Sequence, residues 1–192
     1  QEKLKSIKTK LDKFQKKILE KFDNYIVGIT LLPPPKFAEQ QQDVQQQNQQ
    51  QPADKDKISV LVLVDDSDSK KMSKFELKDK LIVIMSNIAK EIDKNLIPQV
   101  IIISELWQNC YDAKYEILQL IALSAPIFDR GMLAAIKIAE IHKTMVLKKF
   151  EKYIVSYVLA GSLVQGRATP SSDIDVWIVI DDTDVKKMTR AE

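Results

Sequence analysis

Apolar residues recur along this chain with two spacings, one typical of helices and one typical of strands. Near the N-terminus they alternate by three and four, which predicts an amphipathic helix over about residues 3–22. Aliphatic and β-branched runs predict strands at 25–32, 58–64, 99–104, 155–160 and 174–180. Helical patterns lie between them, at about 73–92, 112–123 and 132–150. This alternation predicts an α/β fold, in which a small mixed β-sheet carries helices on its face and the strands share one sheet.

The pattern of the first half returns in the second half. Residues 147–155 match residues 19–27 at six of nine positions, with an offset of 128. Residues 178–188 match residues 62–72 at six of eleven positions, with an offset of 116. Because the two matches occur in the same order, the sequence predicts a tandem repeat, with a first domain at 1–131 and a second at 132–192.

The change of offset places 12 extra residues in the first copy. They fall in a glutamine-rich stretch, where nine of the twelve residues before Pro52 are Gln. Such a composition cannot bury a core, so residues 36–56 are predicted to form a flexible surface loop.

The second copy is expected to be truncated. Residues 189–192 repeat the helix-opening capping box of Ser73–Glu76, so Glu192 would be the third residue of a helix that does not follow. The truncation would expose a sheet edge and the apolar face of Ile174, Val176, Ile178 and Ile180. We therefore expect these strands to pack against the first copy or to self-associate with another chain.

Composition narrows the function classes. Lys and Arg number 29 against 27 Asp and Glu, a net charge of +2, which argues against nucleic-acid or membrane binding through bulk charge. The single cysteine, Cys110, excludes an intramolecular disulfide and fits a reducing cytosol. The apolar runs are too short to span a bilayer, and no signal peptide is visible. The sequence therefore predicts a cytoplasmic protein without a membrane partner.

One segment has the spacing of a phosphate and metal site. Gly161 and Ser162 follow one predicted strand, and Asp173 and Asp175 open the next. Residues i and i+2 of a strand share a face, so both carboxylates point the same way and suit Mg²⁺. Gly161 allows close backbone approach, and Ser162 supplies a hydroxyl and an N–H for a triphosphate. An isolated Asp pair would indicate only a strand end or turn, but the Gly-Ser pair at this spacing favours a binding site.

The order Gly161-Ser162, ten residues, Asp173-Ile174-Asp175 resembles the DNA polymerase β-like nucleotidyltransferase superfamily, and Gly166, Ala168 and Ser172 resemble its minimal members. The resemblance implies that Asp173 and Asp175 are catalytic and bind a pair of Mg²⁺ (or Mn²⁺) ions. It also implies that Gly161 and Ser162 hold the β- and γ-phosphates of a nucleoside triphosphate. The superfamily's third carboxylate would lie beyond Glu192.

Two further residues near this motif have alternative interpretations. Arg167 either contacts a phosphate or is an exposed loop charge. Trp177 lies two residues after Asp175, so its side chain is expected on the same strand face. It either forms the floor of a site for the nucleotide base or, as we favour, packs in the sheet.

The first copy has lost the motif. Gly161 and Ser162 correspond to Pro33 and Pro34, and Pro has no N–H to offer a phosphate. Asp173 and Asp175 correspond to Lys57 and Ser59, and the strand at 99–104 contains no carboxylate. The first domain is therefore predicted to be a degenerate, structural nucleotidyltransferase-like domain.

Two functions follow from these observations. The first is an enzyme, a nucleotidyltransferase that moves a nucleoside monophosphate from a triphosphate such as ATP to an acceptor by a two-metal mechanism. The acceptor is open between nucleic acid, protein and small molecule, and this chain alone is expected to be inactive or very weak. The alternative is a non-catalytic nucleotidyltransferase-like scaffold or regulatory, antitoxin-type binding module.

Overall fold

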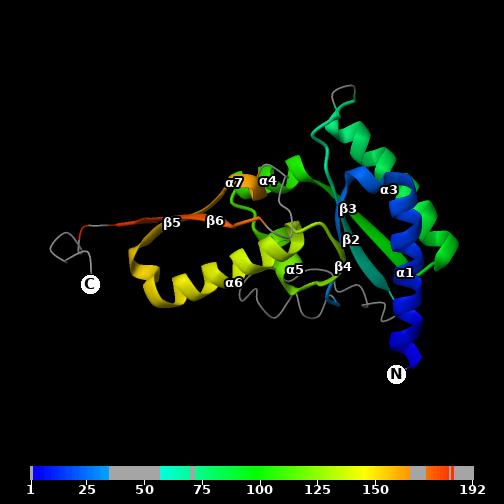
Figure 1. Cartoon of the computed structure of the whole chain (residues 1–192), viewed down its shortest axis with the longest axis horizontal. Coiled ribbons are helices and arrows are strands. Elements are labelled where there is room, and N and C mark those ends of the chain that lie inside the picture. The colour runs from blue at the N-terminus through cyan, green and yellow to red at the C-terminus, as the bar shows by residue number, and fades with distance from the viewer. Residues whose placement is uncertain (1, 35–56, 70–71, 165–171, 182, 184–192) are drawn as a thin grey trace, which may run out of the picture.

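The computed structural model describes residues 2–34, 57–69, 72–164, 172–181 and 183 (Figure 1). The glutamine-rich segment 36–56 and the second capping box at 189–192 lie outside these residues. The elements are α1 (Glu2–Phe22), η1 (Asp23–Tyr25), β1 (Ile26–Leu31), β2 (Ile58–Val64), α3 (Lys74–Ile92), β3 (Leu96–Ile102), α4 (Ile103–Tyr111), α5 (Glu116–Leu123), β4 (Ala125–Asp129), α6 (Met132–Phe150), η3 (Glu151–Tyr153), β5 (Ile154–Ala160), α7 (Gly161–Val164) and β6 (Asp175–Ile180). Among the described residues, no helix combines the length and apolar character needed to cross a membrane.

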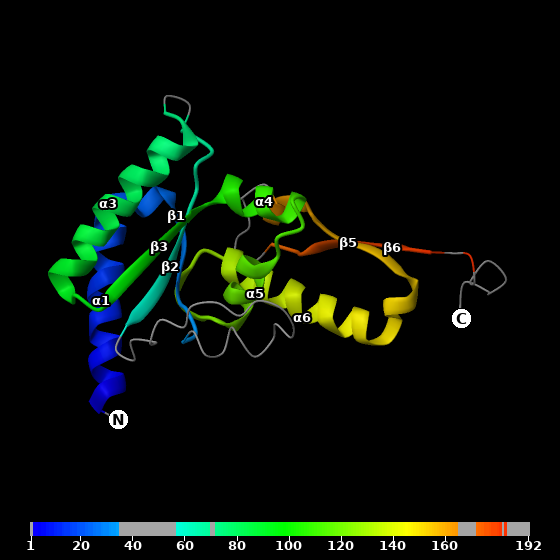
Figure 2. The same ribbon diagram turned by 180° about the vertical axis from the view of Figure 1, so that it is seen from behind.

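A four-stranded mixed sheet with the order β3-β2-β1-β4 forms the centre of the first half. Strand β1 is antiparallel to both β2 and β4, whereas β2 and β3 run parallel. Helices cover both faces of this sheet (Figures 1 and 2). Because β2 is buried on both sides, it is a nearly continuous apolar run and does not alternate with polar residues.

Helices α1 and α3 cover one face. From α1, Leu11, Phe14 and Ile18 are buried against the alternate valines of β2. Lys10 on α1 pairs with Asp93 at the end of α3 at 2.5 Å. The hydrogen bond from Lys10 lowers the pKa of the Asp93 carboxyl below its usual range.

Helices α4 and α5 and the first half of α6 cover the other face. They pack on Leu61 and Leu63, which alternate with the valines of β2. Helix α6 lies directly on β1 at Gly28, where a Cβ would be 2.6 Å from Leu133 Cγ. The absence of a side chain at Gly28 therefore sets how closely α6 approaches the sheet.

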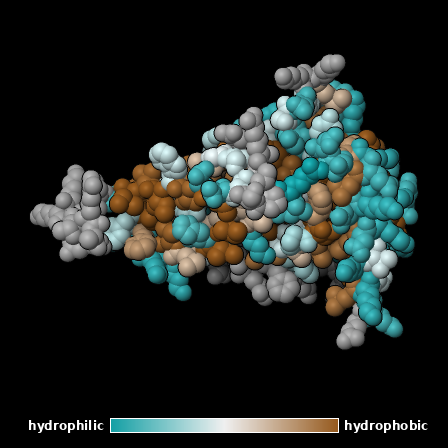
Figure 3. All heavy atoms as spheres, in the orientation of Figure 1, coloured by the Kyte–Doolittle hydropathy of each residue, from teal (hydrophilic) through white to brown (hydrophobic). Residues whose placement is uncertain are grey.

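Strands β5 and β6 form a separate two-stranded antiparallel sheet. The expectation that all strands share one sheet is therefore wrong. The second half of α6 runs along this hairpin, and the Tyr157 hydroxyl on β5 lies 2.9 Å from His142 Nδ1. Figure 3 shows hydrophobic residues gathered around the end of the molecule that carries the hairpin, whereas polar residues dominate at α1.

The two hairpins have the same register. Ile26 pairs with Val64 in the first hairpin and Ile154 with Ile180 in the second, which are the same positions at offsets of 128 and 116. The register shifts directly after this pair in both hairpins. Each hairpin also follows a long helix and one turn of 3-10 helix. All five pairs recorded between β1 and β2 have counterparts between β5 and β6.

The structure differs most from the predicted elements between residues 96 and 129. The third strand begins at Leu96 and ends at Ile102, so Ser104 belongs to helix α4. The Asp66 carboxylate accepts hydrogen bonds from the Ser104 N–H and hydroxyl, and this long-range capping of α4 cannot be read from local sequence.

The helix predicted at 112–123 is confirmed as α5, but it begins at Glu116, and α4 before it was not predicted. A short turn separates α4 from α5, and Ala113 in this turn has a φ of +58°. Strand β4 was not predicted, because it is short and contains Pro126, which is tolerated since β4 lies at the sheet edge. The predicted start of α3 is confirmed, since the Ser73 hydroxyl accepts a hydrogen bond from the Glu76 N–H at 3.2 Å, whereas the Glu76 carboxylate accepts from Lys80 at 2.8 Å.

Candidate functional site

The structure brings the two halves of the Gly-Ser and Asp-x-Asp motif into contact. Ala160, the last residue of β5, pairs with Asp175, the first residue of β6. Gly161 follows with a φ of +73°, a conformation that glycine adopts without steric penalty. A Cβ on Gly161 would lie 2.0 Å from Asp175 Oδ2 and 3.0 Å from its Cγ. The Asp175 carboxylate therefore occupies the space that a side chain at position 161 would fill.

Two apolar side chains anchor this turn from behind. Leu163 in α7 is 1% exposed and belongs to the core beneath α4, α5 and α6. Ile174, between the two aspartates, is partly buried against the same core. The polar residues Asp173 and Asp175 are exposed and Ser162 is half-buried. Sequence reasoning missed the anchoring role of Leu163, although an apolar residue directly after Gly-Ser was a signal for it.

The two carboxylates are not fixed equally. Asp175 is held by its strand pair, whereas Asp173 precedes β6 in irregular chain. The expectation that both lie on one strand face therefore has a structural basis for Asp175 alone. Neither carboxylate forms an ion pair with another described residue, so both are available to a cation.

The sheet face that carries Asp175 is open. Trp177 and Val179 follow it at two-residue spacing and are 70% and 48% exposed. The expected packing of Trp177 in the sheet is therefore wrong. The residues at the same register positions of β2, Leu61 and Leu63, are buried beneath α4, α5 and α6. The same face is thus accessible in the second hairpin and closed in the first.

The residues present fit a magnesium ion only as a partial ligand set. Among the described residues there is no group of three or more His, Cys, Asp or Glu side chains that could hold a metal. Mg²⁺, however, commonly binds one or two carboxylates and completes its coordination with water and substrate phosphates. The exposed carboxylates of Asp173 and Asp175 beside the Gly161 turn fit that arrangement. Arg167, the other predicted phosphate contact, lies outside the described residues.

Comparison with known proteins gives one match. No curated protein matches the chain, and neither does any solved structure. Residues 139–191 match a protein-family model described as a nucleotidyltransferase domain. The matched segment runs from the middle of α6 through β6 and includes Gly161, Ser162, Asp173 and Asp175. This match supports the nucleotidyltransferase superfamily for the segment of the chain that carries the motif.

Proposed function

We propose that this protein transfers a nucleoside monophosphate from a nucleoside triphosphate to an acceptor, using the turn between β5 and β6. The contact between Gly161 and the Asp175 carboxylate is the observation that carries the proposal. It places a backbone turn without a side chain beside an exposed carboxylate, which is what a metal-bound triphosphate requires. The match of residues 139–191 to the nucleotidyltransferase domain supports the same assignment.

Each residue has a proposed role in this site. The backbone of Gly161 and the hydroxyl and N–H of Ser162 bind the terminal phosphates. Asp173 and Asp175 would hold Mg²⁺ or Mn²⁺, which when bound offsets the negative charge of the reacting phosphates. Trp177, exposed on the face of Asp175, offers an aromatic surface on which the base of the nucleotide can stack.

We also propose that the first half is a non-catalytic copy of this domain. The common register of the two hairpins and the preceding helix and 3-10 turn support a duplication. At the positions that match the motif, the first copy carries Pro33, which has no N–H to donate to a phosphate, and Lys57, whose positive charge repels a cation. Helices cover the face of the first sheet on which a nucleotide would have to bind.

The test is a transfer assay with matched variants. The chain is incubated with α-labelled nucleoside triphosphates, Mg²⁺ or Mn²⁺, and RNA, protein or small-molecule acceptors. Asp175→Asn should abolish both metal-dependent triphosphate binding and the weak transfer expected of this chain, whereas Asp79→Asn, an exposed carboxylate on α3, should leave both unchanged. Metal-dependent nucleotide binding without even weak transfer would favour the scaffold function. Failure of both binding and transfer would overturn the proposal.

A further inference from the structure

A cavity lies between the two halves of the chain, on the far side of β5 from Asp175. Residues of α4, α5, α6, β5 and α7 line it, and its volume is about 350 Å³. This volume is within the range of small-molecule sites, which often lie where two domains meet. Leu159 lines the cavity and pairs with Val176 across the hairpin, so their side chains share one face of the two-stranded sheet. Asp175 directly precedes Val176 on β6, and its side chain therefore points to the opposite face. The cavity is therefore separate from the Gly161 turn.

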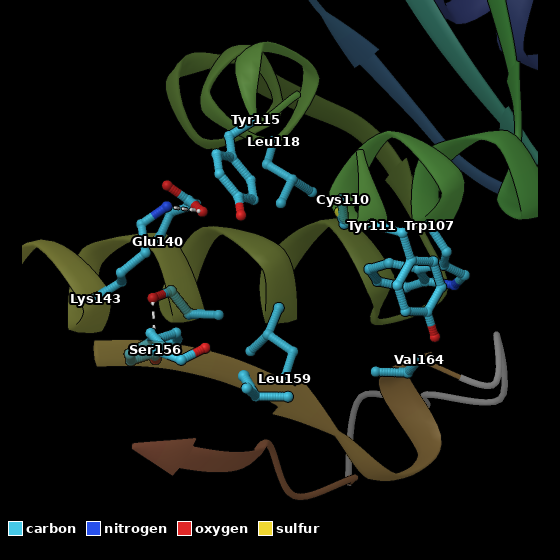
Figure 4. A pocket seen from close by; sticks show the side chains of 13 residues that line it. Trp107, Cys110, Tyr111, Tyr115, Leu118, Glu140, Lys143, Ser156, Leu159 and Val164 are labelled. Carbon is cyan, nitrogen blue, oxygen red and sulfur yellow. Dashed lines mark hydrogen bonds and ion pairs between the residues drawn. The ribbon is translucent and has the colours of Figure 1, made fainter. Parts of the chain in front are cut away.

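Aromatic side chains are concentrated around this cavity. Three of the five tyrosines of the chain and one of its two tryptophans line it, namely Tyr111, Tyr115, Tyr157 and Trp107. Tyr111 is 81% exposed at the mouth. Figure 4 shows Trp107 and Tyr111 at one end and Tyr115 at the other, with Leu159 and Val164 beneath. Flat aromatic walls favour a planar ring that stacks on them.

The end of the cavity near Tyr115 is polar but has no net charge. Glu140 Oε1 pairs with Lys143 Nζ at 2.6 Å, and both side chains are largely shielded from solvent. Lys143 Nζ also lies 5.4 Å from the centre of the Tyr115 ring, within cation–π distance. The pair therefore presents an acceptor and a donor side by side at a fixed position. Burial raises the pKa of the Cys110 thiol, so this side chain, which also lines the cavity, is uncharged at neutral pH.

We propose that this cavity binds the nucleobase of a nucleoside or nucleotide, at a site separate from the Gly161 turn. A nucleobase is planar and uncharged, and it carries a hydrogen-bond donor next to an acceptor on one edge. Glu140 accepts from the donor, Lys143 donates to the acceptor, and the aromatic side chains stack on the ring. Because the pair has no net charge, a ligand that brings a net charge to this end would be buried without compensation. This inference does not depend on nucleotidyl transfer, because it uses none of the motif residues.

The chain contains its own reporters for this site. Trp177→Phe leaves Trp107 as the only tryptophan, and Cys110 is the only cysteine. Both reporters line the cavity. Adenosine, guanosine, cytidine and uridine serve as probes without phosphate and without metal, so the Gly161 turn cannot hold them through phosphate. At least one nucleoside should quench Trp107 fluorescence and slow alkylation of Cys110, both saturably and with the same apparent Kd.

Variants separate this site from the motif. Lys143→Met and Tyr111→Ala should each weaken nucleoside binding about tenfold, and Tyr111 is exposed enough to be replaced without disturbing the core. The matched control is Lys17→Met, which removes an ion pair of the same 2.6 Å length between α1 and α3 and should not change binding. Asp175→Asn should also leave nucleoside binding unchanged, even where it abolishes metal-dependent triphosphate binding.

Three results would overturn the inference. The first is no saturable quenching or protection by any of the four nucleosides. The second is protection of Cys110 by L-phenylalanine or indole at concentrations as low as those of the best nucleoside. The cavity would then bind aromatic rings without recognising the hydrogen-bonding edge of a base. The third is wild-type nucleoside affinity in both Lys143→Met and Tyr111→Ala.

Discussion

Replacing Gly161 with Ala is the most direct perturbation of the contact between the turn and Asp175. The new methyl group would lie 2.0 Å from Asp175 Oδ2, far inside van der Waals contact. The backbone would also have to keep a φ of +73°, which residues with a Cβ rarely adopt. Gly161→Ala therefore combines backbone strain with a steric clash against a proposed metal ligand.

The expected magnitude follows from these two contributions. A left-handed conformation costs a residue with a Cβ about 1–2 kcal/mol. Overpacking typically adds about 1–3 kcal/mol, but Asp175 is exposed and can rotate away, so its share should be small. We expect the free energy of unfolding to fall by about 2 kcal/mol. Metal-dependent nucleotide binding should be lost, because the Asp175 carboxylate is displaced from the turn.

Urea denaturation and calorimetric titration with Mn²⁺ and a nucleoside triphosphate measure the two effects. The control is Gly161→Ala in an Asp175→Ala background, where the nearest remaining side-chain atom is Cβ at 3.3 Å. There the added loss of stability should shrink to the backbone contribution of about 1–2 kcal/mol. A Gly161→Ala protein within about 0.5 kcal/mol of wild type that still binds the metal–nucleotide complex would refute the reasoning.

Further predictions concern the first half of the chain. Gly28→Ala should lower the free energy of unfolding by about 1–3 kcal/mol, measured in urea, because its Cβ would lie 2.6 Å from Leu133 Cγ. Ser73→Ala should reduce stability by about 1 kcal/mol in the same assay, because it removes the cap of α3. The hydrogen bond from Lys10 lowers the pKa of Asp93. Asp93 therefore stabilises the fold at neutral pH, and this contribution is lost as the pH falls below about 4. In the Asp93→Asn variant, the urea midpoint should therefore fall less between pH 7 and pH 3 than it does in the wild type.

Sequence patterns predicted those elements whose cause is local. Helix α1 has a strict apolar period, and β2 is a β-branched run that begins and ends at the predicted residues. The start of α4 was missed because it depends on Asp66, which lies 38 residues from Ser104 in the chain. Strand β4 was missed because its edge position, and not its composition, allows Pro126. The start of α4 and the position of β4 both depend on contacts between segments that are distant in the sequence.

The candidate site was predictable to a similar extent. The motif spacing identified Gly161, Ser162, Asp173 and Asp175, and the structure places the Gly161 turn against Asp175. The aromatic cavity was not predicted, because its walls come from five elements whose proximity no local pattern encodes. Even so, Glu140 and Lys143 are three residues apart on one helix, a spacing at which side chains meet.

The two hairpins differ in helix cover, and we expect this cover, independently of the motif residues, to decide whether a nucleotide can reach the sheet. Leu61 is 1% exposed in the first hairpin, whereas Trp177 at the same register position is 70% exposed in the second. Helices α4, α5 and α6 cover the first face with an apolar cluster. Introducing Asp at Lys57 and Ser59 should therefore not create a site there, because the covering helices would still exclude a triphosphate. We expect the Lys57→Asp, Ser59→Asp variant to show no metal-dependent nucleotide binding beyond that of the second hairpin. A second binding event in calorimetric titration of this variant would show that the packed face opens, and that helix cover is not what closes the first copy.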